Sequence, residues 1–297
     1  MPHDTSPSEP QPRTHLWPAL GRLIRISNQT GTLLLLFPTL WALVLAERNL
    51  PSLRLLLTFI AGAFVMRSAG VILNDLADQS FDRHVARTTA RPLASGELRR
   101  SQAWLLLGLL LVVAGGLVLT LNRLVVTLAP TAVLLAALYP FAKRIVHVPQ
   151  AVLGIAFGWG TIMAWAAVQE RLEAPACCLF GATIAWAIAY DTIYAIQDRE
   201  DDRRIGVKSA ALWFGSWTWL AVGTALAAML LLLGIAGYLA HIGWSYYGML
   251  FGVGLFFVKQ AWELRGAIDP RQAFRMFQAH TWAGAAILAG LVAGFVL

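Results

Sequence analysis

Apolar stretches long enough to cross a membrane recur along the chain from Thr30 onward. A helix needs about 20 apolar residues to span the hydrocarbon core of a bilayer, and polar breaks divide the chain into nine such runs. We therefore predict an all-α, polytopic membrane protein. About nine transmembrane helices are expected, at residues 30–46, 54–73, 103–121, 123–141, 151–168, 175–196, 216–239, 243–261 and 279–297.

The composition supports this class of protein. Hydrophobic residues make up 58% of the chain and charged residues 13%, whereas a soluble domain carries about 25% charged residues. A soluble globule is therefore excluded. The net charge of +7 is typical of cytoplasmic loops in a chain this apolar, so it does not indicate a nucleic-acid partner. The sequence also indicates no obligate protein partner.

The distribution of basic residues predicts the orientation. If the N-terminus is cytoplasmic, 19 of the 23 Lys and Arg residues lie on that side. Positive residues accumulate in cytoplasmic loops, so we expect a cytoplasmic N-terminus and an external C-terminus. Residues 1–20 are polar and proline-rich, which predicts a disordered cytosolic tail. A single transmembrane domain is expected over residues 21–297.

Two acidic clusters occur at the predicted cytoplasmic ends of the second and sixth spans. Both place a polar residue at every fourth position. The first cluster contains Asn74, Asp78 and Asp82, and the second contains Tyr194, Asp198 and Asp202. Because the two copies lie four spans apart, we predict two pseudo-repeated four-helix halves with a ninth helix added.

The spacing of these clusters indicates a chemistry. Residues four apart share a helix face, so each cluster forms a stripe, and Asp191 extends the second one. Paired carboxylates suit Mg²⁺, which keeps several waters and takes further oxygens from phosphate groups. The alternative is that the aspartates only cap helices and solvate loops. Two copies at matched spacing favour a Mg²⁺-bridged polyphosphate.

Three other polar side chains fall near these stripes. Arg67 lies seven residues before Asn74, inside the second span. A buried arginine in a membrane faces the bundle interior and pairs with an anion, either a ligand or one of the aspartates. Tyr139 and Lys143 end the fourth span and can point together into the site. An interfacial aromatic and a snorkelling lysine are the alternative roles for this pair.

Several stretches together match the signatures of a known family. They are residues 66–82, 87–96, 139–144, 149–154 and 189–209, with residues 31–41 in the first helix. The chain resembles the UbiA family of intramembrane aromatic prenyltransferases over about residues 22–290. The resemblance implies a Mg²⁺-dependent enzyme that transfers a polyprenyl group from polyprenyl diphosphate to an aromatic ring within the bilayer.

The resemblance also implies roles for individual residues. The implied Mg²⁺ ligands are Asn74, Asp78, Asp82, Asp198 and Asp202. The implied substrate contacts are Arg67, Asn74, Arg87, Lys143, Arg144 and Lys208. The implied catalytic residues are Asp191, Tyr139 and Tyr194. Arg67 is expected to bind an acceptor carboxylate, and Asp191 to accept the hydrogen bond of the acceptor phenol.

The finer detail resembles family members that prenylate 4-hydroxybenzoate ortho to its phenol, a step of ubiquinone synthesis. This implies a bacterial-type inner membrane, with the active site facing the cytoplasm. Homogentisate, dihydroxynaphthoate and haem b remain alternative acceptors. A transporter is disfavoured because ionisable groups gather at one side. Two departures from the family pattern are Ser27-Asn28-Gln29 and His280, which is expected before the last helix.

Overall fold

The computed structural model describes residues 16–83, 85, 87–206 and 208–296, and these form helices without any strand. In a bilayer the backbone must satisfy its own hydrogen bonds, which favours helices. The long helices are α2 (Thr30–Glu47), α3 (Leu53–Asp82), α4 (Arg100–Leu119), α5 (Arg123–Ile145), α6 (Pro149–Gln169), α7 (Ala174–Ala195), α10 (Thr218–Leu239), α11 (Trp244–Glu263) and α12 (Pro270–Val296). The short ones are α1 (Leu16–Leu23), α8 (Arg199–Ile205), α9 (Ala210–Phe214) and the 3₁₀ turns η1 (Ile196–Asp198) and η2 (Gly215–Trp217).

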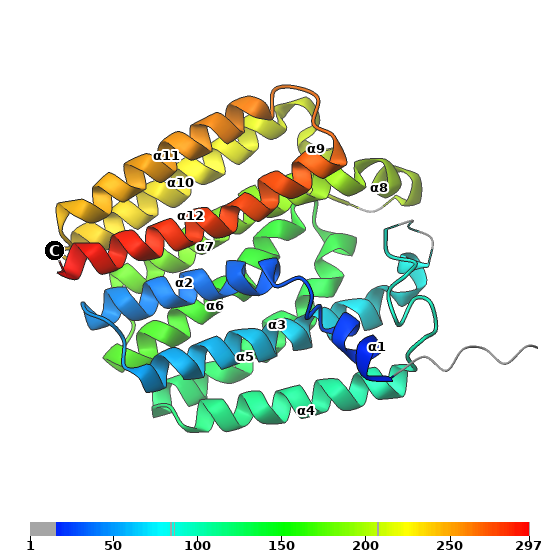
Figure 1. Ribbon diagram of the computed structural model, residues 1–297, viewed down its shortest axis with the longest axis horizontal. Coiled ribbons are helices and arrows are strands. Elements are labelled where there is room, and N and C mark those ends of the chain that lie inside the picture. Colours follow the sequence, from blue (N-terminus) through cyan, green and yellow to red (C-terminus); the bar gives the residue numbers. More distant parts are fainter. Residues whose placement is uncertain (1–15, 84, 86, 207, 297) are drawn as a thin grey trace, which may run out of the picture.

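Eight helices in the described part of the chain are long and apolar enough to cross a membrane. The ninth predicted span, at residues 243–261, corresponds to α11, which is 20 residues long and runs beside α10 and α12 (Figure 1). It is not among those eight helices, and Tyr, Trp, Lys, Gln and Glu interrupt its apolar stretch. The prediction of an all-helical, multi-pass membrane protein is confirmed.

Three helix boundaries differ from those predicted. The second span continues as one helix to Asp82, so the first acidic cluster lies on α3 itself. The last helix begins at Pro270, which places His280 inside α12 and corrects its expected place in a preceding loop. At the other end of the chain, α1 covers residues 16–20 of the expected tail, and residues 1–15 lie outside the described residues.

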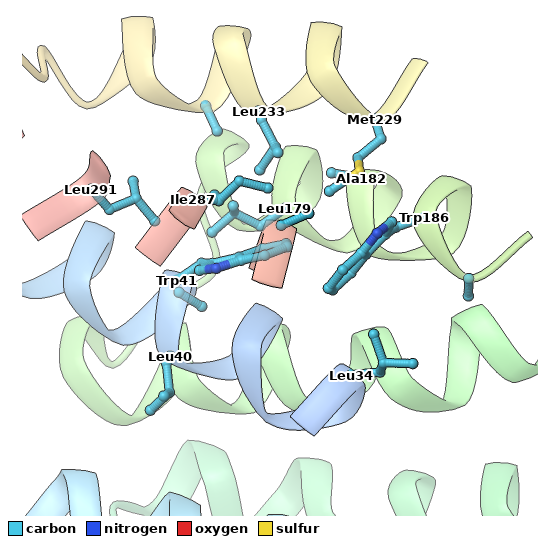
Figure 2. Close-up of a cluster of buried hydrophobic side chains, with 14 of the residues drawn as sticks. Leu34, Leu40, Trp41, Leu179, Ala182, Trp186, Met229, Leu233, Ile287 and Leu291 are labelled. Atoms are coloured by element: carbon cyan, nitrogen blue, oxygen red, sulfur yellow. The ribbon is translucent and has the colours of Figure 1, made fainter. Parts of the chain in front are cut away.

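The largest core surrounds α7, which packs against α6, α10, α12 and α2. Figure 2 shows Trp41 of α2 and Trp186 of α7 at its centre, with ring centroids 5.0 Å apart. Both indole N–H groups have partners, since Trp41 donates to the Gly284 carbonyl at 3.1 Å and Trp186 donates to His280 Nδ1 at 2.8 Å. Buried indoles usually need such partners, so these bonds fix α12 against α2 and α7.

A second core joins α1 to α3 and α4. Ala19 and Leu23 of α1 are fully buried there, beside Ala69 and Ile72 of α3. This packing holds α1 at the end of the bundle where α3 finishes. In Figure 1 the C-terminal end of α3, α1 and α8 all lie at one end, and the chain's C-terminus lies at the other. The two acidic clusters therefore meet at the same end.

Candidate active site

A cavity of about 880 Å³ lies inside the bundle, with walls from α2, α3, α4, α5, α6, α7 and α12. Its lining is polar where α3 and α7 end, and apolar through the rest of its length. The apolar body includes Phe59, Val118, Val133, Phe157 and Met163. A cavity with a charged end and a long apolar body suits a ligand with an anionic head and a hydrocarbon tail.

Six of the predicted site residues line this cavity. They come from α3, the loop after it, α5 and α7, and they are Arg67, Asn74, Arg87, Tyr139, Asp191 and Tyr194. Residues from three parts of the sequence, α3 with its following loop, α5 and α7, are thus brought to one surface. The sequence predicted that these side chains belong to one site, and the fold places them together.

Arg67 occupies the wall of the cavity deep in the bundle. Among the described residues it donates no hydrogen bond and forms no ion pair. Asp191 and the phenols of Tyr139 and Tyr194 are near enough to interact with its charge electrostatically. A guanidinium ion at this depth is costly unless something compensates its charge. The geometry therefore favours an anionic ligand as the partner of Arg67.

The first acidic cluster is held by arginines. Asp75 is 1% exposed. Arg25 Nη2 donates to both of its carboxylate oxygens, to Oδ1 at 3.0 Å and to Oδ2 at 2.9 Å. Arg91 Nη1 bridges Asp75 at 3.1 Å and Asp82 at 2.8 Å. Asp78 is fully buried, 3.8 Å from Arg144. These ion pairs offset the repulsion among three carboxylates on one helix face.

The second acidic cluster is tied to the loop after α3. Arg87 forms a bidentate ion pair with Asp198, at 2.8 and 2.6 Å, and donates to the Tyr194 hydroxyl at 3.0 Å. These hydrogen bonds to the carboxylate raise the pKa of Arg87 above its ordinary value, although burial acts in the opposite direction. Arg87 therefore ties the loop after α3 to the second cluster.

The second cluster does not form the continuous helical stripe that its spacing predicted. Helix α7 ends at Ala195, η1 follows, and Asp202 lies on the separate short helix α8. At the end of α7 the Ile196 N–H bonds to Ile193 and Tyr194 carbonyls, which tightens the last turn to 3₁₀ geometry. Because a 3₁₀ turn has three residues rather than 3.6, it shifts the register between Asp191 and Asp202.

Two predicted substrate contacts lie outside the cavity lining. Arg144 donates to the Ala77 carbonyl at 2.9 Å and stacks on Phe81 and Phe141. Lys208 donates to the Ile145 carbonyl at 2.9 Å, which joins the loop before α9 to the end of α5. The side chain of Lys143 lies outside the described residues.

The carboxylates at this end of the bundle suit a divalent metal of one kind. Within the described residues, no group of three or more His, Cys, Asp or Glu side chains is close enough to hold an ion. Mg²⁺ does not require such a group, because it takes one or two carboxylates and fills its shell with waters and phosphate oxygens. Asp78 and Asp82 on α3 and Asp198 after α7 supply hard oxygens that fit this mode. They and Asp202 lie outside the cavity lining, at the same end of the bundle as its polar end. Two of these carboxylates form ion pairs with arginines, Asp198 with Arg87 and Asp82 with Arg91.

Several residues of this site were not predicted from the sequence. Arg25, from the link between α1 and α2, and Arg91 line the cavity and share Asp75. Phe277 of α12 lines it as well and packs on Tyr194, with ring centroids 4.7 Å apart. The position of Asp75 beside Asn74 was a usable signal. Nothing in the sequence indicated that the last helix packs against the second acidic cluster.

The two departures from the family pattern fall in different places. Asn28 lines the polar end of the cavity, and Gln29 donates to the Arg25 carbonyl at 2.9 Å, which braces the link between α1 and α2. His280 is fully buried in the aromatic core between α7 and α12. The His280 departure therefore concerns packing, whereas residues 27–29 border the site.

The fold and the cavity define a polytopic helical membrane protein with a cavity that suits an amphipathic anionic ligand within the bundle. Residues 35–283 match the UbiA prenyltransferase family, and the chain belongs to that family. It is 45% identical to a 4-hydroxybenzoate octaprenyltransferase of Serratia proteamaculans, over 94% of this chain and 96% of that protein. A protein of the same name from Pectobacterium carotovorum is 47% identical, over 94% and 96% of the two chains.

Solved structures share the fold. The apo structure of a UbiA homologue from Aeropyrum pernix superimposes with a TM-score of 0.74 at 24% identity, covering 88% of this chain and 97% of that one. A UbiA homologue from Archaeoglobus fulgidus bound to DMAPP and Mg²⁺ superimposes with a TM-score of 0.69 at 16% identity, covering 94% and 100%.

Proposed function

We propose that this protein transfers an all-trans polyprenyl group from polyprenyl diphosphate to 4-hydroxybenzoate, at the carbon ortho to the phenol. One observation carries the proposal. Arg67, which no described residue holds by a hydrogen bond or ion pair, lines a cavity whose body is apolar and whose end is charged. An aromatic carboxylate and a prenyl chain together fit this lining. The 4-hydroxybenzoate octaprenyltransferase names of relatives that are 45–47% identical support the same assignment.

The diphosphate and a divalent metal, Mg²⁺, are assigned to the charged end. Asp78, Asp82, Asp198 and Asp202 would hold the metal, with Asn74 assisting. A metal held there would supply positive charge to stabilise the departing diphosphate. Arg87, Lys143, Arg144 and Lys208 add to that charge, and Arg87 is able to exchange its present partner, Asp198, for a diphosphate oxygen. The homologue bound to DMAPP and Mg²⁺ supports this arrangement.

The acceptor is assigned to the deeper polar residues. Arg67 holds its carboxylate, since a guanidinium binds a carboxylate through two parallel hydrogen bonds. Asp191 accepts the hydrogen bond of the phenol, which makes the ring more nucleophilic. Tyr139 and Tyr194 offer hydroxyls to the diphosphate or ring faces to the allylic cation. Their places around one cavity support these roles.

The reaction exchanges one bond for another. The bond between C1 of the prenyl group and the diphosphate oxygen breaks, and the oxygen keeps the electron pair. The ring carbon ortho to the phenol forms a new bond to C1, and the ring then loses one proton. The apolar walls around the prenyl chain keep water from the allylic cation. This chain binds both substrates, makes the ring more nucleophilic through Asp191 and excludes solvent.

The proposed setting is a bacterial inner membrane, with the N-terminus and the charged end of the cavity facing the cytoplasm. The 19-to-4 division of basic residues supports this orientation. Polyprenyl diphosphate would enter with its head at the cytoplasmic end and its chain along the apolar body of the cavity. Both substrates could then meet without leaving the bilayer.

An assay of membranes that contain the protein tests which acceptor is prenylated. Geranyl diphosphate is supplied with 4-hydroxybenzoate, homogentisate, 1,4-dihydroxy-2-naphthoate or haem b in separate reactions, and the products are identified by mass spectrometry. We expect prenylated 4-hydroxybenzoate, and its complete loss in excess EDTA with recovery on adding Mg²⁺. Product from another acceptor alone would overturn the assigned substrate, and full activity in EDTA would overturn the metal.

A further inference from the structure

The guanidinium of Arg67 lies unusually close to the first turn of α2. A Cβ atom added to Gly31 would be 2.6 Å from Arg67 Nε, 2.6 Å from Nη2 and 3.0 Å from Cζ. Equal distances to the two nitrogens place that point directly in front of the edge formed by Nε and Nη2. Only a residue without a side chain leaves this space to Arg67.

The contact matters because both residues line the cavity. Arg67 is the deep cation of the site, and no described residue holds it by a hydrogen bond or an ion pair. Its orientation therefore depends on packing. The Nε–Nη2 edge lies against the backbone of Gly31. This packing positions the guanidinium in the cavity wall without an ion pair to a protein carboxylate.

We propose that Gly31 is a positioning residue that orients Arg67 toward the acceptor carboxylate and thereby makes the enzyme select acidic acceptors. This inference rests on the proposed function, in which Arg67 holds that carboxylate. A methyl group at position 31 would displace the guanidinium, because the atoms it meets are the far end of a flexible side chain. The backbone of α2 would not have to move.

The variant Gly31→Ala tests the inference. Alanine has a higher helix propensity than glycine, and Gly31 is within α2 with no positive φ, so the variant is expected to fold. We expect the KM for 4-hydroxybenzoate to rise by at least about fivefold, since charge-assisted hydrogen bonds are weakened. The KM for the prenyl diphosphate should stay unchanged. Gly31→Ser, with one more atom in the same space, should show a larger effect.

The matched control is Gly108→Ala on α4, where an added Cβ meets nothing within 4 Å and the residue does not line the cavity. Its kinetics should equal those of the wild type. Thermal unfolding in detergent checks that all variants are folded. An acceptor KM in Gly31→Ala and Gly31→Ser equal to that of Gly108→Ala would overturn the inference.

A second readout separates positioning from general damage. The wild type should prefer 4-hydroxybenzoate to the uncharged 4-hydroxybenzamide, and Gly31→Ala should reduce this preference. The double variant Gly31→Ala, Arg67→Ala should lose no more preference than Arg67→Ala alone, because both changes act through one guanidinium. Equal loss toward both acceptors, or additive losses, would overturn the inference. If the wild type makes no product from 4-hydroxybenzoate, the proposed function fails first.

Discussion

Arg67, inside a transmembrane span, indicates a bound ligand more clearly than the arginines at the end of that span do. Placing Arg at the centre of a membrane helix costs about 2.5–3.5 kcal/mol on insertion scales. Arg25, Arg87 and Arg91 offset their charge in ion pairs with aspartates, whereas Arg67 has no such partner among the described residues. A buried charge that no described residue holds by an ion pair is best explained by a ligand.

Replacing Arg67 with Lys provides the residue-scale prediction. Lysine keeps the charge but cannot form two parallel hydrogen bonds with a carboxylate. We expect the KM for 4-hydroxybenzoate to rise by about tenfold or more, as the loss of a charge-assisted hydrogen bond implies. The KM for polyprenyl diphosphate and the Mg²⁺ requirement should change little, as steady-state kinetics with each substrate varied in turn will measure. A larger effect on prenyl diphosphate or Mg²⁺ would instead mean that Arg67 serves the diphosphate.

At the scale of elements, α3 combines two functions in one 30-residue helix. Its N-terminal part is apolar, and its last turns carry the aspartates. Asp75 on these turns joins α3 to the α1–α2 link through Arg25 and to the following loop through Arg91. A buried carboxylate that binds two arginines from different segments fixes those segments relative to the helix.

The variant Asp75→Asn tests this connection. This change removes the negative charge that pairs with Arg25 and Arg91. Breaking a fully buried ion pair lowers the free energy of unfolding by about 3–5 kcal/mol. The loss is smaller here because both arginines are partly exposed. We expect lower thermal stability in detergent and faster trypsin cleavage after Arg22 or Arg25.

The matched control for that variant is Glu97→Gln, which removes only the ion pair between Glu97 and the half-exposed Arg22. Exposed pairs contribute about 0–1 kcal/mol, so its cleavage rate should stay near that of the wild type. Equal cleavage of Asp75→Asn and Glu97→Gln would show that Asp75 does not hold the link.

At the scale of the whole molecule, the bundle brings both acidic clusters, α1 and the loop after α3 to one end. The long apolar cavity starts at that end and continues between the spans. Such an arrangement gives the molecule a polar face for soluble substrates and an apolar interior for a lipid chain. Its orientation in the membrane then decides which compartment supplies the aromatic acceptor.

Cysteine labelling tests the orientation. Cysteines introduced at exposed positions of the 87–99 loop, such as Thr89→Cys, should react with a membrane-impermeant maleimide only after cells are opened. A cysteine at Arg171, in the exposed link between α6 and α7, should react in intact cells and serves as the opposite control. Reaction of the loop cysteine in intact cells would reverse the proposed topology.

Most of the fold follows from the sequence because the bilayer leaves few choices. Apolar runs of spanning length must become helices, and the spacing of Asn74, Asp78 and Asp82 places them on one face of α3. The motifs of the two clusters also identified the family. These conclusions need only local pattern and chemistry, so they were available without tertiary structure.

The tertiary structure decided what each polar group contacts. Periodicity predicted a continuous second stripe, but the 3₁₀ turn after α7 separates Asp191 from Asp202. Three contacts join segments far apart in the chain. Asp75 pairs with Arg25, Phe277 packs on Tyr194, and Arg67 packs against Gly31. Sequence pattern reports which face of a helix is polar, whereas the partner across that face depends on how the helices pack.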